Sequence, residues 1–135
     1  MTKGIFYLAT PHHGSDLARV LANFGLLLRT SDIVKELGAD EATLASLNRW
    51  YIDNAPAKLG ISTEVLFEKF EAKLKVGKVL VVDARSSDIG ISGVRPIAVD
   101  EDHISICKPR SPTALQRLML EQFIDRILRP TITPE

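Results

Sequence analysis

Cysteine is nearly absent from this chain: Cys107 stands alone, so no intrachain disulfide can form. Neither sign of charge is in excess, because 17 lysines and arginines balance 17 aspartates and glutamates. A balanced chain lacks the electrostatic footprint of a protein that binds nucleic acid or an anionic membrane surface. No apolar run approaches the roughly 18 residues that a membrane-spanning helix requires, so no transmembrane segment is expected.

The residues after Met1 also lack the apolar core of a secretory signal peptide. We therefore expect a cytoplasmic protein, unless targeting residues precede Met1. What is present is an ordinary globular composition, with 45% hydrophobic and 25% charged residues in a chain of 135. That length suits one domain with a buried core.

Several short segments are expected to be strands. Gly4–Ala9 is continuously apolar, which is typical of a strand buried inside a parallel sheet. Such a strand expects neighbours on both sides. The next expected strands are Ile61–Phe67, which is rich in β-forming residues, and the apolar run Lys78–Asp83, followed by a short extended segment at Ile97–Val99.

Helical patterns separate these strands. Two are expected after the caps Ser15 and Ser31, and Asp40 opens a third that ends at Asn54–Pro56. Residues 16–56 would form a helical cap over a pocket or pack on the surface. The last helix is expected to begin at Ser111–Pro112 and to stop at Pro130, with a buried stripe of Leu115, Leu118, Met119, Phe123, Ile124 and Ile127. This alternation predicts an α/β fold with a mostly parallel sheet.

Four segments in this order carry a resemblance to a known family: Gly4–Ser15 (GIFYLATPHHGS), Val65–Glu68 (VLFE), Val79–Ser87 (VLVVDARSS) and Asp102–Lys108 (DHISICK). Together they resemble the C-terminal half of the serine-esterase and lipase branch of the α/β-hydrolases. That branch includes the GPI inositol-deacylase-like and serine-active-site-containing proteins. The resemblance spans nearly the whole chain and implies that residues 1–135 are the C-terminal portion of an α/β-hydrolase domain.

The resemblance also implies a catalytic triad, whose members follow the chain order Ser, Asp or Glu, His. His103 would be the general base, and Glu68, at the end of a strand, would be the acid that orients its ring. Asp83 is the alternative acid, ahead of Asp88 and Asp100. The implied substrate is an ester or lipid-like molecule, and the family uses neither a metal nor an organic cofactor. Without the resemblance, a structural loop histidine would be the default interpretation of His103.

The nucleophile is missing from these residues, because no Gly-x-Ser-x-Gly motif occurs. Gly90–Val94 comes nearest but lacks the final glycine. We therefore expect the serine and the oxyanion hole to come from an upstream segment, and the chain alone to be inactive. The alternative is a non-catalytic remnant or protein-interaction module, which would self-associate through an uncovered sheet edge at its first strand.

Other chemistry-bearing residues have simpler interpretations. His12 and His13 are adjacent on a turn and lack a Cys/His partner cluster, so no metal site is expected. Cys107 is expected to be a small buried packing residue rather than part of a Cys–His dyad. Trp50 and Tyr51 are expected to pack in the core, with the lining of an acyl pocket as the alternative.

Overall fold

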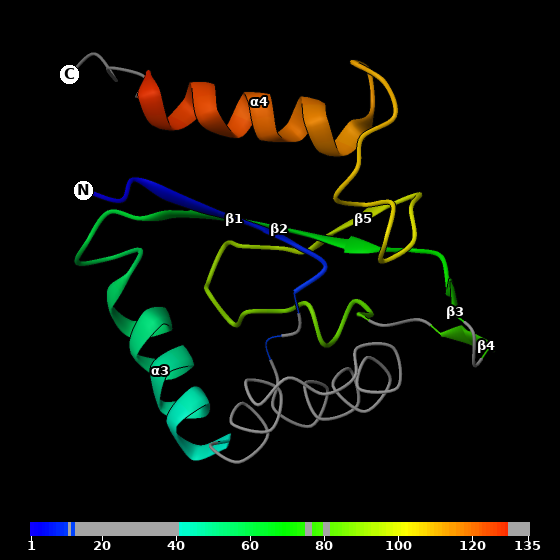
Figure 1. Cartoon of the computed structure of the whole chain (residues 1–135). Helices are drawn as coiled ribbons and strands as arrows, with labels where there is room; N and C mark the ends of the chain where they lie inside the picture. The colour runs from blue at the N-terminus through cyan, green and yellow to red at the C-terminus, as the bar shows by residue number, and fades with distance from the viewer. Residues whose placement is uncertain (11, 13–40, 75–76, 80–81, 130–135) are drawn as a thin grey trace.

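The computed structural model describes residues 1–10, 12, 41–74, 77–79 and 82–129. Figure 1 shows that the two faces of a parallel sheet are each covered by a helix of the described part of the chain. The expected helices between residues 15 and 38 lie outside the described residues. The described elements are β1 (Gly4–Leu8), α3 (Glu41–Asn54), β2 (Ser62–Glu68), β3 (Ala72–Leu74), β4 (Gly77–Val79), β5 (Ile97–Val99) and α4 (Leu115–Leu128).

The three-stranded sheet has the order β1-β2-β5, and both pairings are parallel. β1 runs alongside β2 from Gly4↔Ser62 to Leu8↔Leu66. β5 pairs only with the last three residues of β2, ending at Glu68↔Val99. This small open parallel sheet with flanking helices is compatible with the expected α/β class, and the carboxyl ends of β2 and β5 meet at one edge.

The expected strands are found with one exception. β1, β2 and β5 match their predicted ranges to within one residue, and Ala9 leaves the sheet in the left-handed conformation, with φ at 47°. The strand expected over Lys78–Asp83 is confirmed only at its beginning. β4 covers Gly77–Val79 and pairs antiparallel with β3 in a separate two-stranded sheet, Val82 and Asp83 are not in a strand, and residues 80–81 lie outside the described residues. The buried Val82 donates its N–H to a side chain, Glu68, rather than to a neighbouring strand.

The two faces of the sheet bury separate clusters, because alternate side chains of a strand point to opposite faces. On the face covered by α4, Leu66 packs with Ala9, Val99 and Ile106. On the face covered by α3, Val65 packs with Ile89 and Ile91, against which Tyr51 and Ile52 of the helix also pack.

α3 attaches to the sheet through Tyr51. Its hydroxyl lies 2.8 Å from Thr63 Oγ1 on β2, and its ring meets Tyr7 edge-on at 6.4 Å between centroids. The expectation that Tyr51 packs in the core is confirmed. The same expectation for Trp50 is wrong, because that side chain is 53% exposed.

The C-terminal half of α4 packs closely on β1. The Phe123 ring is buried and lies 5.4 Å from the Phe6 ring. Gly4 permits this approach, since a Cβ at that position would lie 2.7 Å from Phe123 Cζ. Arg126 adds an ion pair to Glu64 of β2.

The start of α4 and part of its buried stripe differ from the expectation. The helix begins at Leu115, because Ser111 instead closes a turn in which its carbonyl accepts the Ala114 N–H at 3.2 Å. Gln116, which the sequence did not single out, is buried on the inner face. Three expected stripe residues are exposed instead: Leu115, Leu118 and Ile124.

Phe123→Ala is expected to lower the free energy of unfolding by about 3 to 5 kcal/mol, because it removes a buried aromatic side chain and leaves a cavity. Ile124→Ala is the matched control; that side chain is 40% exposed, and the loss should stay near or below about 1 kcal/mol. Urea denaturation of the two variants measures both values. Equal losses would contradict the packing of α4 described here.

Candidate active site

His103 and Glu68 meet at the carboxyl edge of the sheet. Glu68 is the last residue of β2, and its side chain is fully buried. Its Oε1 lies 3.3 Å from His103 Nδ1 and accepts the backbone N–H of Val82 at 2.6 Å. The His103 side chain remains 19% exposed. The arrangement is therefore a buried carboxylate against one nitrogen of an imidazole that solvent reaches in part.

The pairing of β2 with β5 brings these two residues together across 35 positions of the chain. Hydrogen bonds continue beyond the strands: Lys69 N–H donates to the carbonyls of Val99 and Glu101, and Phe70 N–H also donates to Glu101. Because the two segments stay paired past the sheet, the short link from Glu101 to His103 starts from a fixed position.

A tight turn then holds His103. Asp102 Oδ1 accepts the N–H groups of Ile104 at 2.9 Å and Ser105 at 2.8 Å, while Ser105 Oγ accepts the Asp102 N–H at 3.0 Å. The hydrogen bond from the Ser105 backbone N–H is the main cause that lowers the pKa of Asp102 below its ordinary value of 3.8. The hydrogen bond from the Ile104 N–H lowers this pKa further, whereas burial acts to raise it. Ile106 anchors the turn in the core. Sequence reasoning did not single out Asp102 for this role, although aspartate and serine side chains in a loop often bond to nearby backbone N–H groups.

Asp83 forms a second turn of the same design. Its Oδ1 accepts both the N–H and the hydroxyl of Ser86 at 2.8 Å, and Ser86 Oγ accepts the Asp83 N–H at 2.9 Å. The Ser86 carbonyl accepts the His12 backbone N–H at 2.8 Å. This turn directly follows Val82, whose N–H binds Glu68. Asp83 thus shapes the segment that supports the Glu68 carboxylate.

The remaining candidate acids make other contacts. Asp88 Oδ1 accepts the Gly90 N–H at 2.9 Å, and Asp100 pairs with Lys69 at 2.8 Å on the surface. Of the sequence-predicted carboxylates, Glu68 lies in contact with His103, with 3.3 Å between Oε1 and Nδ1. The geometry brings this acid and this base together; their catalytic role stays a prediction.

Three other reactive side chains, those of His12, Tyr7 and Cys107, have different surroundings. The His12 ring packs edge-on against Tyr7, with 4.6 Å between centroids. Burial, with a further contribution from Tyr51, raises the pKa of Tyr7 to about 12, so its hydroxyl stays protonated at neutral pH. Cys107 is exposed, and the expectation that it is buried is wrong, because its neighbour Ile106 takes the inward position.

Over the part of the chain that the structure describes, no three histidine, cysteine or acidic side chains are grouped so that they could hold a metal ion. None of the described helices is long and apolar enough to cross a membrane. A carboxylate–imidazole pair of this kind can accept a proton from a hydroxyl placed at the second ring nitrogen and later return it.

Comparisons with known proteins show similarity to Protein SERAC1 of several vertebrates. The chain is 35% identical to Protein SERAC1 of Danio rerio over 130 residues, and equally to Protein SERAC1 of Homo sapiens. The match covers 94% of this chain and 19% of each relative, so the chain spans about one fifth of the length of the curated relatives it matches. No family model and no solved structure matches the chain.

Asp102→Ala is expected to destabilise the protein at neutral pH by about 1 kcal/mol, the usual loss for a side chain that caps backbone N–H groups. Because folding lowers the pKa of Asp102 from 3.8, its contribution is present above pH 3.8 and disappears as the pH falls below that value through the folded-state pKa. The difference between parent and variant should therefore shrink on acidification.

Urea denaturation at neutral pH and in steps below pH 3.8 measures this difference. Asp53→Ala, at an exposed position of α3, is the control and should leave the stability nearly unchanged. A gap between Asp102→Ala and the parent that persists undiminished in acid would contradict the role of the ionised carboxylate.

Proposed function

We propose that this chain carries the acid and the base of a serine ester hydrolase of the α/β-hydrolase type, with His103 as general base and Glu68 as its orienting carboxylate. The observation that carries the proposal is the 3.3 Å contact between Glu68 Oε1 and His103 Nδ1. The substrate would be a carboxylic ester, including lipid-like esters.

Three further features support this proposal. The acid precedes the histidine in the chain, as the order of an α/β-hydrolase triad requires. Both lie at the carboxyl edge of a parallel sheet, where ligands bind in open α/β folds. The similarity to Protein SERAC1 over 94% of the chain agrees with the family that the sequence motifs resemble.

The proposed mechanism follows from the orientation of the imidazole ring. When Nδ1–H of His103 donates to Glu68, Nε2 is the ring nitrogen that would take the proton of a serine hydroxyl as the serine oxygen attacks the ester carbonyl. The buried Glu68 carboxylate stabilises the resulting imidazolium. That imidazolium then protonates the departing alcohol oxygen, and the same ring activates the water that cleaves the acyl-enzyme.

The serine would come from outside these residues. No Gly-x-Ser-x-Gly motif occurs in the 135 residues, and the chain matches about one fifth of its relatives. We therefore place the nucleophile and the oxyanion hole in another segment of a longer protein, or in a separate chain, with residues 1–135 as the C-terminal portion of the domain. Within the proposed cap at 16–56, α3 packs on the sheet through Tyr51, which favours surface packing for that helix.

A second candidate function is a non-catalytic interaction module. Leu120, Ile124 and Leu128 are exposed at intervals of four residues on α4, so they form an apolar stripe on its flank. β1 is an outer strand of the described sheet, and an outer strand can pair with another chain.

His103→Gln, made in the longest natural protein that contains these residues, is expected to lower kcat/KM for a p-nitrophenyl ester by roughly 10³-fold or more. Glu68→Gln should cause a loss of about 10²-fold or more, because it removes the charge that holds and stabilises the imidazolium. Asp83→Asn separates the two candidate acids: its effect should be clearly smaller than that of Glu68→Gln, and the reverse order would identify Asp83 as the acid.

Circular dichroism should show that each variant is folded. Asp53→Asn, at an exposed position of α3, serves as the control for charge removal. Full activity of His103→Gln would refute the proposed base. Labelling of the isolated 135-residue chain by a fluorophosphonate probe would contradict the proposal that the nucleophile comes from elsewhere.

A further inference from the structure

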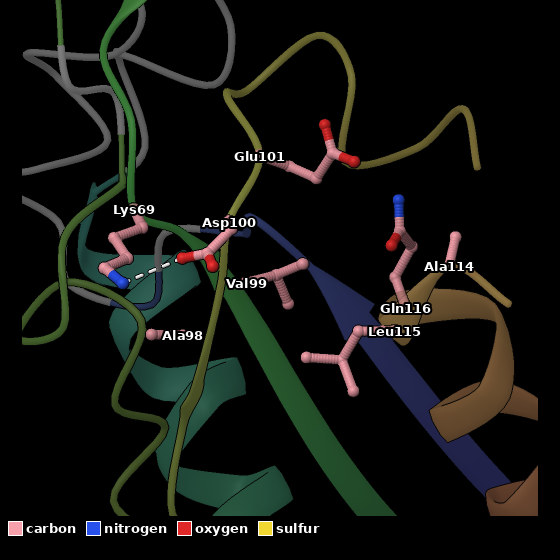
Figure 2. Close-up of a pocket in the computed structure, with 8 residues that line it drawn as sticks. All are labelled: Lys69, Ala98, Val99, Asp100, Glu101, Ala114, Leu115 and Gln116. Carbon is pink, nitrogen blue, oxygen red and sulfur yellow. Dashed lines mark hydrogen bonds and ion pairs between the residues drawn. The ribbon is translucent and has the colours of Figure 1, made fainter. Parts of the chain in front are cut away.

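A pocket of about 350 Å³ lies between the start of α4 and the segments that follow β2 and β5. Figure 2 shows its lining: Lys69, Asp100 and Glu101 come from the two segments, and Gln116 comes from the first turn of the helix. Neither Glu68 nor His103 lines it. The pocket is therefore a feature separate from the proposed catalytic pair.

Gln116 is the most informative residue of this pocket. It is only 4% exposed, because it lies on the inner face of α4 in line with the buried Phe123. Within the described residues, its Nε2 has no hydrogen-bond partner. Figure 2 shows this amide end turned toward the loop that carries Glu101. Since buried polar groups are nearly always hydrogen-bonded, an amide without a partner at a pocket wall indicates that a ligand supplies the acceptor.

The beginning of α4 offers further donors. The first N–H groups of a helix have no partner within the helix. Ala114, at the N-cap, makes no side-chain capping bond, and both Ala114 and Leu115 line the pocket. An acceptor atom that binds Gln116 Nε2 would therefore also lie close to backbone donors.

The charged residues that line the pocket indicate which class of ligand it can bind. Lys69 pairs with Asp100 at 2.8 Å, which leaves the Glu101 carboxylate as the uncompensated charge among the charged lining residues. A negative charge there disfavours phosphate or sulfate, although a helix N-terminus alone would attract them. The described residues also lack a group of three metal ligands. The ligand must accept from Gln116 and donate to a carboxylate.

A hydroxyl group does both, because it carries one donor hydrogen and two acceptor lone pairs. Neighbouring hydroxyls of one molecule could bind Gln116 and Glu101 together, while Val99 and Leu115 contact its C–H groups. We infer that this pocket binds a small polyhydroxylated molecule, a polyol or a single sugar residue. This inference is independent of the proposed hydrolase function.

The test is a titration of the full chain with D-glucose and with sorbitol, followed by ¹H–¹⁵N NMR. Either compound should shift the Gln116 side-chain amide and the backbone N–H groups of Leu115 and Gln116, and the shifts should saturate. Gln116→Met keeps the size of the side chain and removes its polar atoms, and it should weaken binding at least 10-fold. Gln122→Met, at an exposed position of the same helix, is the matched control and should bind like the parent.

The melting temperature gives a second readout that does not require the ligand. Gln116→Met should melt at the same temperature as the parent or higher, because it removes a buried donor that has no partner in the protein. Melting several degrees lower would show that the amide has a structural partner, and would overturn the inference. Saturable binding of inorganic phosphate instead of the polyols would overturn the ligand class, and binding of neither would overturn the site.

Discussion

The pairing of the last residues of β2 with β5 determines where Glu68 and His103 lie relative to each other. The register Glu68↔Val99 ends the sheet, and the backbone bonds from Lys69 and Phe70 to Glu101 extend the contact into the loops. Without this pairing, the carboxylate on β2 would be buried with less compensation, which is unfavourable for an ionised group. With it, the Val82 N–H and the His103 ring both reach the Glu68 carboxylate.

Two turns of the same local design support that carboxylate and that ring. Asp83–Ser86 and Asp102–Ser105 each contain an aspartate whose Oδ1 accepts the serine N–H, and a serine whose Oγ accepts the aspartate N–H. The first turn follows the residue that binds Glu68, and the second contains His103. Such reciprocal bonds satisfy backbone donors locally, so both turns can hold their shape next to the sheet without being part of it.

The sequence predicted the fold where one physical signal dominated. Gly4–Leu8 is apolar and Ser62–Glu68 contains a β-forming core, and burial in a parallel sheet is the main constraint on such segments. The strand expected over Lys78–Asp83 does not extend to Val82, because that residue donates its N–H to the Glu68 side chain instead of to a neighbouring strand. α4 begins later than expected because Ser111 closes a turn ahead of the helix instead of capping the helix itself.

In the candidate site, too, local sequence signals identified some residues, while tertiary contacts decided the positions of others. His103 and Glu68 were found from motifs and from the position of Glu68 at a strand end, but their contact depends on strand register, which sequence periodicity does not specify. Gln116 was missed for a related reason. A glutamine in the first turn of an amphipathic helix is normally solvated, and only the rotation of α4 about its axis places this one inward. Cys107 and Trp50 were misplaced because packing of their neighbours decided which side chain faces the core.

The close approach at Gly4 makes the attachment of α4 unequal along its length. Phe123 packs over the missing side chain of Gly4, and Arg126 both stacks on the Phe123 ring and pairs with Glu64. The opening turn has no side-chain cap and presents Leu115 to solvent. Local stability follows buried contacts, so the C-terminal half of α4 is held firmly against the sheet and its first turn is held less firmly. The first turn is therefore the part of α4 that can shift when a small molecule binds, while the C-terminal half keeps its position.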